Sequence, residues 1–165
     1  MEKYILILRR ITLGFNWVAL IIMLPLMSIT VSVAVFMRYV VQRPIIGADE
    51  ITGLLMLILY FFSLAHCWNE DGHIRSEIII SHLDKRWKLF SDIFASTAVL
   101  IFSIPFIYAL TKYMLFYYKI HRVTLDTDIQ LWPFWAIAVF GTLLLILSIL
   151  LTLINLIMKL KKNGS

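Results

Sequence analysis

The polar residues best placed to form a functional site lie in the segment 38–50, between two long apolar runs. It holds two arginines and an adjacent pair of acids: Arg38, Arg43, Asp49 and Glu50. Acids at the start of a helix are favoured by the helix dipole. The segment therefore predicts either a helix cap with interfacial anchors, or a polar joint that fixes the first helix against the second or against a partner subunit. In the second case we expect Arg38 to pair with Asp49 or Glu50.

The remaining cysteine, histidine and hydroxyl side chains do not match a known metal-binding or catalytic motif. Cys67 is the one cysteine, so an internal disulfide is ruled out. It adjoins His66, with His73 further along, but two histidines and a thiol at a helix end do not match the usual zinc spacings. The chain has no Ser/His/Asp set and no Gly-rich phosphate loop. We therefore expect no catalytic, substrate-binding or metal site, no cofactor and no enzyme.

Composition indicates a membrane protein. Hydrophobic residues make up 61% of the 165 residues and charged residues 15%, whereas soluble domains are about half apolar and a quarter charged. The net charge of +5 comes from basic residues at the ends of apolar runs, which argues against nucleic-acid binding. Arg9-Arg10 is faintly similar to a twin-arginine export signal, but the apolar run behind it is too long for one.

Four apolar runs predict four transmembrane helices in a single membrane domain over residues 1–165. The expected spans are 11–37, 51–69, 93–111 and 129–158. Roughly 20 helical residues cross a bilayer, so the first and fourth spans must tilt, kink or protrude. Pro25 and Pro105 mark possible kinks. The segment 112–128 is expected to be a long polar connection whose first part is aromatic.

Residues 76–90 predict a different kind of helix. Ile79, Leu83 and Trp87 recur at helical spacing among polar residues, which is typical of an amphipathic helix in the membrane interface. Docking on a partner is the alternative. We expect these three side chains, together with Trp132 and Trp135 at the start of the fourth span, to be interfacial anchors. The predicted fold is thus all-α, with four transmembrane helices and one interfacial helix between the second and third.

The distribution of Lys and Arg predicts the orientation. With the N-terminus inside, ten of the 15 basic residues fall on the inner side and five on the outer side. The inner set is Lys3, Arg9, Arg10, Arg75, Lys85, Arg86, Lys88, Lys159, Lys161 and Lys162, and the outer set is Arg38, Arg43, Lys112, Lys119 and Arg122. The positive-inside rule then places both termini in the cytoplasm and the 38–50 turn outside.

The expected spans contain no Asp, Glu, Lys or Arg. Ionisable groups in a membrane usually mark proton relays, ion pathways or substrate counter-ions. A small drug/proton antiporter needs an acid inside its first helix, and a cytochrome b anchor needs histidines on two spans as haem ligands. Neither pattern is present, and the two halves of the chain show no repeat of the kind many transporters have. The sequence favours a partner subunit over an autonomous transporter.

Three stretches resemble one family. They are Arg38 through Arg43-Pro44 to Asp49-Glu50, then Gly72-His73-Ile74 before the amphipathic segment, and Leu131-Trp132-Pro133 through Trp135 to Gly141. With four spans and both ends inside, they resemble the small membrane subunit, DctQ-like, of tripartite ATP-independent periplasmic (TRAP) transporters. The family's acidic pair is commonly two glutamates, and the Trp and Pro at the entry to its fourth helix are placed differently.

The resemblance implies a scaffold subunit in a bacterial inner membrane. Its partners would be a large multi-span membrane subunit, which moves an organic anion with a sodium gradient, and a periplasmic binding protein. The substrate class would be sialic acid or a C4-dicarboxylate. Arg122, Asp126 and Asp128 are then candidates for docking the binding protein, although a plain solvated loop explains them equally well. The alternative is a free-standing four-helix assembly or lipid-interacting protein with no transport role.

Overall fold

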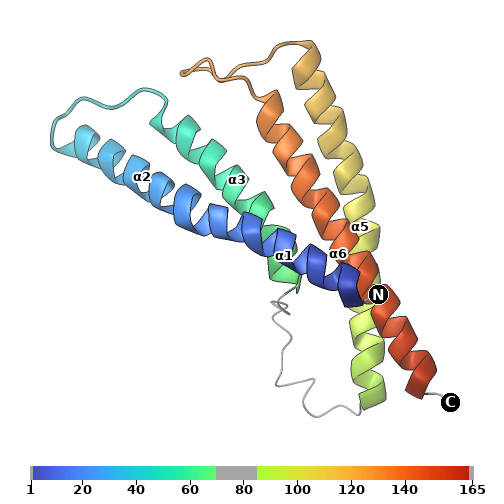
Figure 1. The fold of residues 1–165 in the computed structure, drawn as a ribbon. Helices are drawn as coiled ribbons and strands as arrows, with labels where there is room; N and C mark the ends of the chain where they lie inside the picture. The colour runs from blue at the N-terminus through green and yellow to red at the C-terminus, as the bar shows by residue number, and fades with distance from the viewer. Residues whose placement is uncertain (1, 70–84, 164–165) are drawn as a thin grey trace.

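The computed structural model describes residues 2–69 and 85–163, with side chains over 6–69 and 91–158. The elements are α1 (Glu2–Val18), the π-helical turn η1 (Ala19–Met23), α2 (Leu24–Tyr39), α3 (Ala48–Asn69), α5 (Lys85–Lys119) and α6 (Trp132–Asn163) (Figure 1). Among the described residues, four stretches are long and apolar enough to cross a membrane: Leu6–Tyr39, Ala48–Asn69, Ser91–Lys119 and Trp132–Met158. The prediction of an all-helical chain with four such helices is confirmed.

The first of these stretches is one long helix with an irregular turn near its middle. η1 separates α1 from α2, and Pro25 lies in the first turn of α2. A proline has no backbone N–H and its ring crowds the carbonyl four residues earlier. A π-helical turn just before it is one way in which a helix accommodates this. The irregularity thus falls where the sequence placed a possible kink.

The third long helix extends further than the sequence predicted. α5 runs from Lys85 to Lys119, so residues 112–119 are helical and the non-helical connection is correspondingly shorter than the expected 112–128. Tyr113 and Tyr117, one turn apart, both contact the ring of Trp135 on α6, with centroids 5.5 and 5.6 Å away. This aromatic packing continues the α5–α6 contact beyond the charge-free run, and helix stability in proteins comes mostly from such packing.

The predicted interfacial helix falls largely outside the described residues. Residues 76–84, with Ile79 and Leu83, lie outside them, and so does the side chain of Trp87. Residues 85–90 form the first turns of α5 and run without a break into the third span. In the described part of the chain, the end of the expected amphipathic segment therefore belongs to the long helix.

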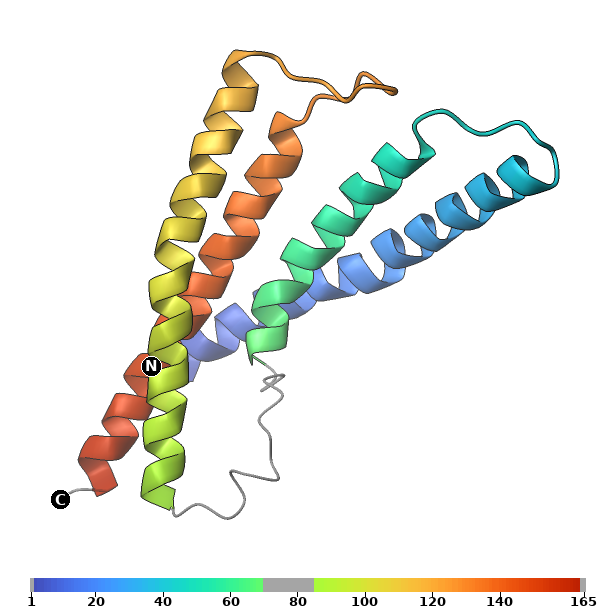
Figure 2. The same cartoon turned by 180° about the vertical axis from the view of Figure 1, so that it is seen from behind.

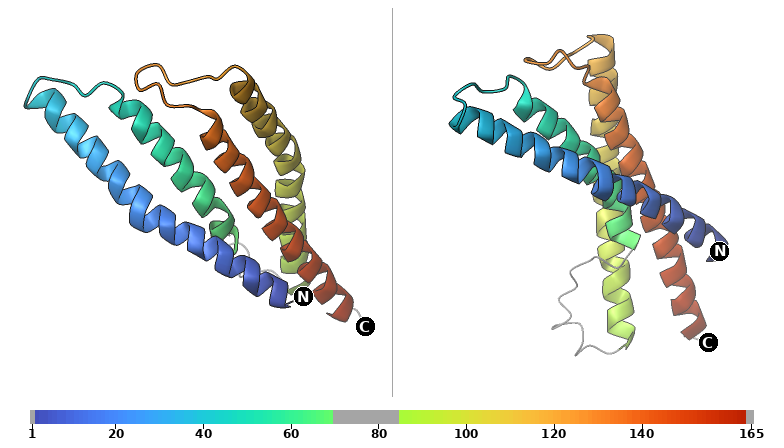
Figure 3. Two further views of the ribbon diagram at one scale, coloured as in Figure 1. Left: turned by 45° about the horizontal axis from the view of Figure 1, so that its top comes forward. Right: turned by 60° about the vertical axis from the view of Figure 1, so that its left-hand side comes forward.

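The helices form an open row. Figure 3 shows the order α1–α2, α3, α6, α5, and contacts join each helix to its neighbour in that order. The pair α2–α3 diverges from the pair α5–α6 towards the end where both short connections lie, and the described ends of α1 and α6 lie at the opposite end (Figures 1 and 2). We call the end with the connections 40–47 and 120–131 the loop end.

The best-buried packing lies between α3, α6 and α5. One cluster comprises Ala65, Trp68, Leu145, Ile149 and Leu153, and a second comprises Phe61, Leu110 and Ala138. Gly141 on α6 allows α3 to approach, because a Cβ there would lie 2.5 Å from the carbonyl oxygen of Phe61. α6 is accordingly the most buried of the four apolar helices, and the N-terminal one is the least buried.

Candidate functional site

The connection from α2 to α3, residues 40–47, is stabilised by hydrogen bonds of its own backbone. The N–H of Arg43 donates to the carbonyl of Met37 at 3.0 Å, and the N–H of Ile51 donates to the carbonyl of Gly47 at 3.0 Å. Gln42 and Gly47 have positive φ angles of 55° and 80°. Positive φ suits a glycine, so Gly47 supplies the bend that lets α3 begin at Ala48.

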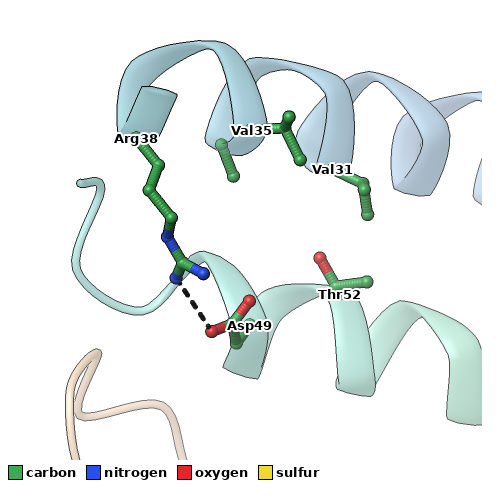
Figure 4. A pocket seen from close by; sticks show the side chains of 6 residues that line it. Val31, Val35, Arg38, Asp49 and Thr52 are labelled. Carbon is green, nitrogen blue, oxygen red and sulfur yellow. Dashed lines mark ion pairs between the residues drawn. The ribbon is translucent and has the colours of Figure 1, made fainter. Parts of the chain in front are cut away.

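An ion pair joins the two helices across this turn. Arg38 in the last turn of α2 places Nη2 3.6 Å from Oδ2 of Asp49 in the first turn of α3 (Figure 4). The side chains are 58% and 91% exposed. An exposed pair of this length contributes little to stability, although the carboxylate is well placed at the positive end of the α3 dipole.

The connection from α5 to α6 folds into a small hairpin. Val123 and Gln130 form an antiparallel bridge, and the N–H of Thr124 donates to the carbonyl of Ile129 at 2.9 Å. The Thr124 hydroxyl lies 2.7 Å from that of Thr127 and accepts from the N–H of Ile129 at 3.0 Å. These bonds give the loop a defined shape.

Glu50 joins the two connections to each other. Its Oε1 accepts from the N–H groups of Leu125 and Asp126 at 2.8 and 3.1 Å. Its Oε2 accepts from the N–H of Thr127 at 3.1 Å and from the Thr127 hydroxyl at 2.9 Å. Hydrogen bonds to an ionised carboxylate are stronger than neutral ones. The acid at the start of α3 therefore holds the tip of a hairpin that follows it by more than 70 residues.

Gly47 fits closely under the same hairpin. A Cβ at Gly47 would collide with Cγ2 of Thr127. Gly47, the last residue of the connection, and Ala48, the first residue of α3, are both buried although they lie at the end of the row. The absence of a side chain at 47 thus serves both the backbone turn and the close approach of the hairpin.

The remaining predicted residues of the loop end have distinct places. Arg43 is exposed, and it takes no part in the pair between Arg38 and Asp49. The three proposed docking residues, Arg122, Asp126 and Asp128, are all exposed. Their roles in partner contact stay predictions.

Trp132 and Trp135 are half-buried between α5 and α6. Trp132 donates through Nε1 to Oε1 of Gln130 at 2.9 Å and meets the ring of Tyr118 edge-on at 5.5 Å. Trp135 lies against Tyr113 and Tyr117. Both tryptophans therefore link the two helices in addition to any contact with the bilayer interface.

The opposite end of α3 is tied to its neighbours by polar side chains. Asn69 donates through Nδ2 to the hydroxyl of Thr12 at 3.0 Å. Trp68 donates through Nε1 to the hydroxyl of Thr152 at 3.4 Å. His66 and Cys67 lie beside them, but the described residues contain no group of three His, Cys, Asp or Glu able to hold a metal ion. His73 lies outside the described residues.

Sequence reasoning missed the partners of Glu50. It grouped Glu50 with Asp49 as alternative partners of Arg38, whereas the structure gives them separate contacts. The threonines 124 and 127 were not singled out at all. Two polar residues that close a hairpin resemble any solvated loop in a sequence, and no local spacing predicts a contact across 77 positions.

The described residues form four long apolar helices with charged groups gathered near their ends, and this arrangement defines a multi-pass membrane protein. The family model for the DctQ component of tripartite ATP-independent periplasmic transporters matches residues 27–159, most of the chain. The chain therefore belongs to this family. A comparison with curated proteins gave no match.

Family membership decides several points at once. The chain is the small membrane component of a TRAP transporter and not an enzyme. The family implies a large membrane component and a periplasmic binding protein as partners. The alternative of a free-standing assembly with no transport role is thereby overturned.

Proposed function

We propose that this subunit is a scaffold that holds its large partner in the membrane and presents a rigid surface at the loop end. The observation that carries the proposal is the set of contacts from Glu50 to residues 125–127. Together with the Arg38–Asp49 pair, they join α2, α3 and the α5–α6 hairpin into one unit. A scaffold needs such fixed connections, and it needs no charged pathway through its spans.

The open row supports the same role. A row of four helices leaves two broad apolar faces, and large hydrophobic side chains on α2 and α5 are widely exposed, among them Ile29 and Phe102 at 60% and 68%. The bilayer covers part of such a surface. The remainder is available to another multi-span protein, because helices of two membrane proteins associate through close side-chain packing.

The surroundings of the transporter follow from the charge distribution and the family. We place the subunit in a bacterial inner membrane with both termini in the cytoplasm and the loop end facing the periplasm, because the sequence assigns ten of its 15 Lys and Arg residues to the inner side and five to the outer side. The exposed residues Arg122, Asp126 and Asp128 are then available to the periplasmic binding protein.

We propose further that the assembled transporter imports an organic anion, of the sialic acid or C4-dicarboxylate class, with a sodium gradient. The small subunit itself provides no ion site in this scheme, because its charged side chains are concentrated at the helix ends. Uptake by the reconstituted complex, with a panel of carboxylates and an imposed sodium gradient, tests both parts. Equal uptake under a potassium gradient would contradict sodium coupling.

The scaffold role is tested by purification of the tagged chain from gently solubilised native membranes, followed by mass spectrometry. We expect one large partner with many apolar spans. A soluble periplasmic protein should accompany it when the periplasmic contents are kept with the membranes during solubilisation. The Glu50→Gln variant should keep the large partner and lose the soluble one. A wild-type chain that emerges alone would contradict the scaffold proposal.

A further inference from the structure

A small groove lies between the end of α2 and the start of α3. It has a volume of about 140 Å³ and is lined by Val31, Ala34, Val35, Arg38, Asp49 and Thr52. Figure 4 shows the valines on α2 facing Thr52 on α3, with the Arg38 side chain extending from α2 to Asp49 at the loop end. The wall of the groove on α2 is therefore largely apolar, and the groove carries a cation and an anion at one end.

The charged end of the groove has hydrogen-bonding groups that a ligand could reach. The Arg38 guanidinium has five N–H donors, and its contact with Asp49 is a single long one of 3.6 Å. Asp49 is 91% exposed, and the neighbouring Glu50 carboxylate is engaged with residues 125–127. A positive and a negative group thus lie side by side, both accessible, close to the end of the apolar stretch Leu6–Tyr39.

The apolar part of the groove opens onto the exposed surface of a helix that is long and apolar enough to cross a membrane. Val31 and Val35 lie in one of the four apolar stretches and are substantially exposed. The Thr52 hydroxyl donates to the carbonyl of Ala48 at 2.8 Å, so it does not require a partner in the groove. A hydrocarbon chain meets no unpaired donor there.

We infer that this groove binds one phospholipid whose headgroup carries both a phosphate and an ammonium. The phosphate lies against Arg38, which suits a planar guanidinium with several donors. The ammonium lies against Asp49, and the first part of an acyl chain lies on Val31, Ala34 and Val35. The bound lipid fills the gap between α2 and α3 and strengthens their contact at the loop end.

Native mass spectrometry tests this inference on the full-length chain, purified in detergent with the partners that accompany it. Dioleoylphosphatidylethanolamine is titrated against the wild type and against three variants. Arg38→Gln removes the cation, and Val35→Trp fills the groove while the charges remain. Arg43→Gln is the matched control, because Arg43 is an exposed arginine of the same turn that does not line the groove.

We expect both groove variants to bind the lipid about ten-fold more weakly than the wild type, and the control to bind it equally well. Dioleoylphosphatidylglycerol, which has no ammonium, and dioleoylglycerol, which has no phosphate, should bind more weakly than the ethanolamine lipid. Asp49→Asn should remove the preference for ethanolamine over glycerol. Equal weakening in the Arg43 control, or unchanged binding in Val35→Trp, would show general attraction to a basic surface and overturn the inference.

Discussion

At the scale of single residues, two adjacent acids perform different tasks. Asp49 faces Arg38 and is almost fully exposed. Glu50 turns towards the hairpin and accepts four hydrogen bonds, three of them from backbone N–H groups. Successive residues of a helix point about 100° apart, so one acid contacts α2 and the other contacts the 120–131 hairpin. Their order along the chain decides which pair of segments each one joins.

Glu50→Gln should loosen the hairpin. An amide keeps one acceptor oxygen, but its NH₂ group then faces a donor from Thr127, so at least one bond is lost and the charge is removed. We expect hydrogen exchange of the amides of residues 125–127 to accelerate about ten-fold, measured by mass spectrometry in detergent. Asp49→Asn is the control and should leave these amides unchanged. Equal exchange in both variants would show that Glu50 does not hold the hairpin.

Charge reversal at Arg38 separates stability from assembly. Because the Arg38–Asp49 pair is exposed, Arg38→Glu should lower the free energy of unfolding by less than about 1 kcal/mol. If the pair braces the subunit for its partner, assembly with the large subunit and transport should nevertheless fall strongly, and the exchanged pair Arg38→Glu with Asp49→Arg should restore them. Intact assembly and transport in the single variant would exclude the brace.

At the scale of elements, one glycine fixes the distance between α3 and α6. Gly141 leaves no room for a Cβ beside the backbone of Phe61, and the second core cluster, with Phe61 and Ala138, lies at the same level. Small residues allow close helix approach in membranes, where packing replaces the hydrophobic effect as the driving force. Because position 141 has no side chain, α3 and α6 can pack closely at this level.

Gly141→Ala should destabilise the protein even though alanine favours helices by about 1 kcal/mol. The added methyl must displace the backbone of α3, and overpacking of this kind costs about 1–3 kcal/mol. We expect a lower thermal midpoint, followed by tryptophan fluorescence in detergent. Gly53→Ala on α3 is the matched control, since nothing lies within 4 Å of its added Cβ, and its midpoint should be unchanged or higher. A stabilised Gly141→Ala variant would contradict the close contact.

At the scale of the whole molecule, the open row explains why so much apolar surface remains. α6 has the largest buried share and lies between α3 and α5, whereas the N-terminal helix touches mainly α3. A closed bundle would bury more of these apolar faces in contacts among its own helices. Under the scaffold proposal, the row offers one of its apolar faces to lipid and the other to a second membrane protein.

The proposed orientation makes a direct labelling prediction. In a Cys67→Ser background, which removes the one native thiol, a cysteine at position 125 should react with a membrane-impermeant maleimide in intact cells, because Leu125 is 87% exposed at the hairpin tip. A cysteine at position 163 should react only after the membrane is permeabilised. If position 163 is labelled in intact cells and position 125 only after permeabilisation, the proposed orientation is wrong.

The sequence by itself determined the elements that composition and periodicity control. Apolar runs without charge predicted four long helices, and three local motifs indicated the family. The helix ends were harder to predict, as in α5, because Tyr113 and Tyr117 continue a helix through contacts with Trp135 on another one. Residues 70–84, where most of the interfacial helix was expected, lie outside the described part of the chain.

Only the tertiary structure decided how these elements are joined. It showed an open row, the fit of Gly141 against Phe61, and the separate partners of Asp49 and Glu50. Local patterns report which surface of a helix is apolar, since that depends on neighbours one turn away. They do not report which distant segment meets that surface. The sequence therefore shows Glu50 as an acid at the start of a helix, and only the fold shows that its carboxylate links two connections.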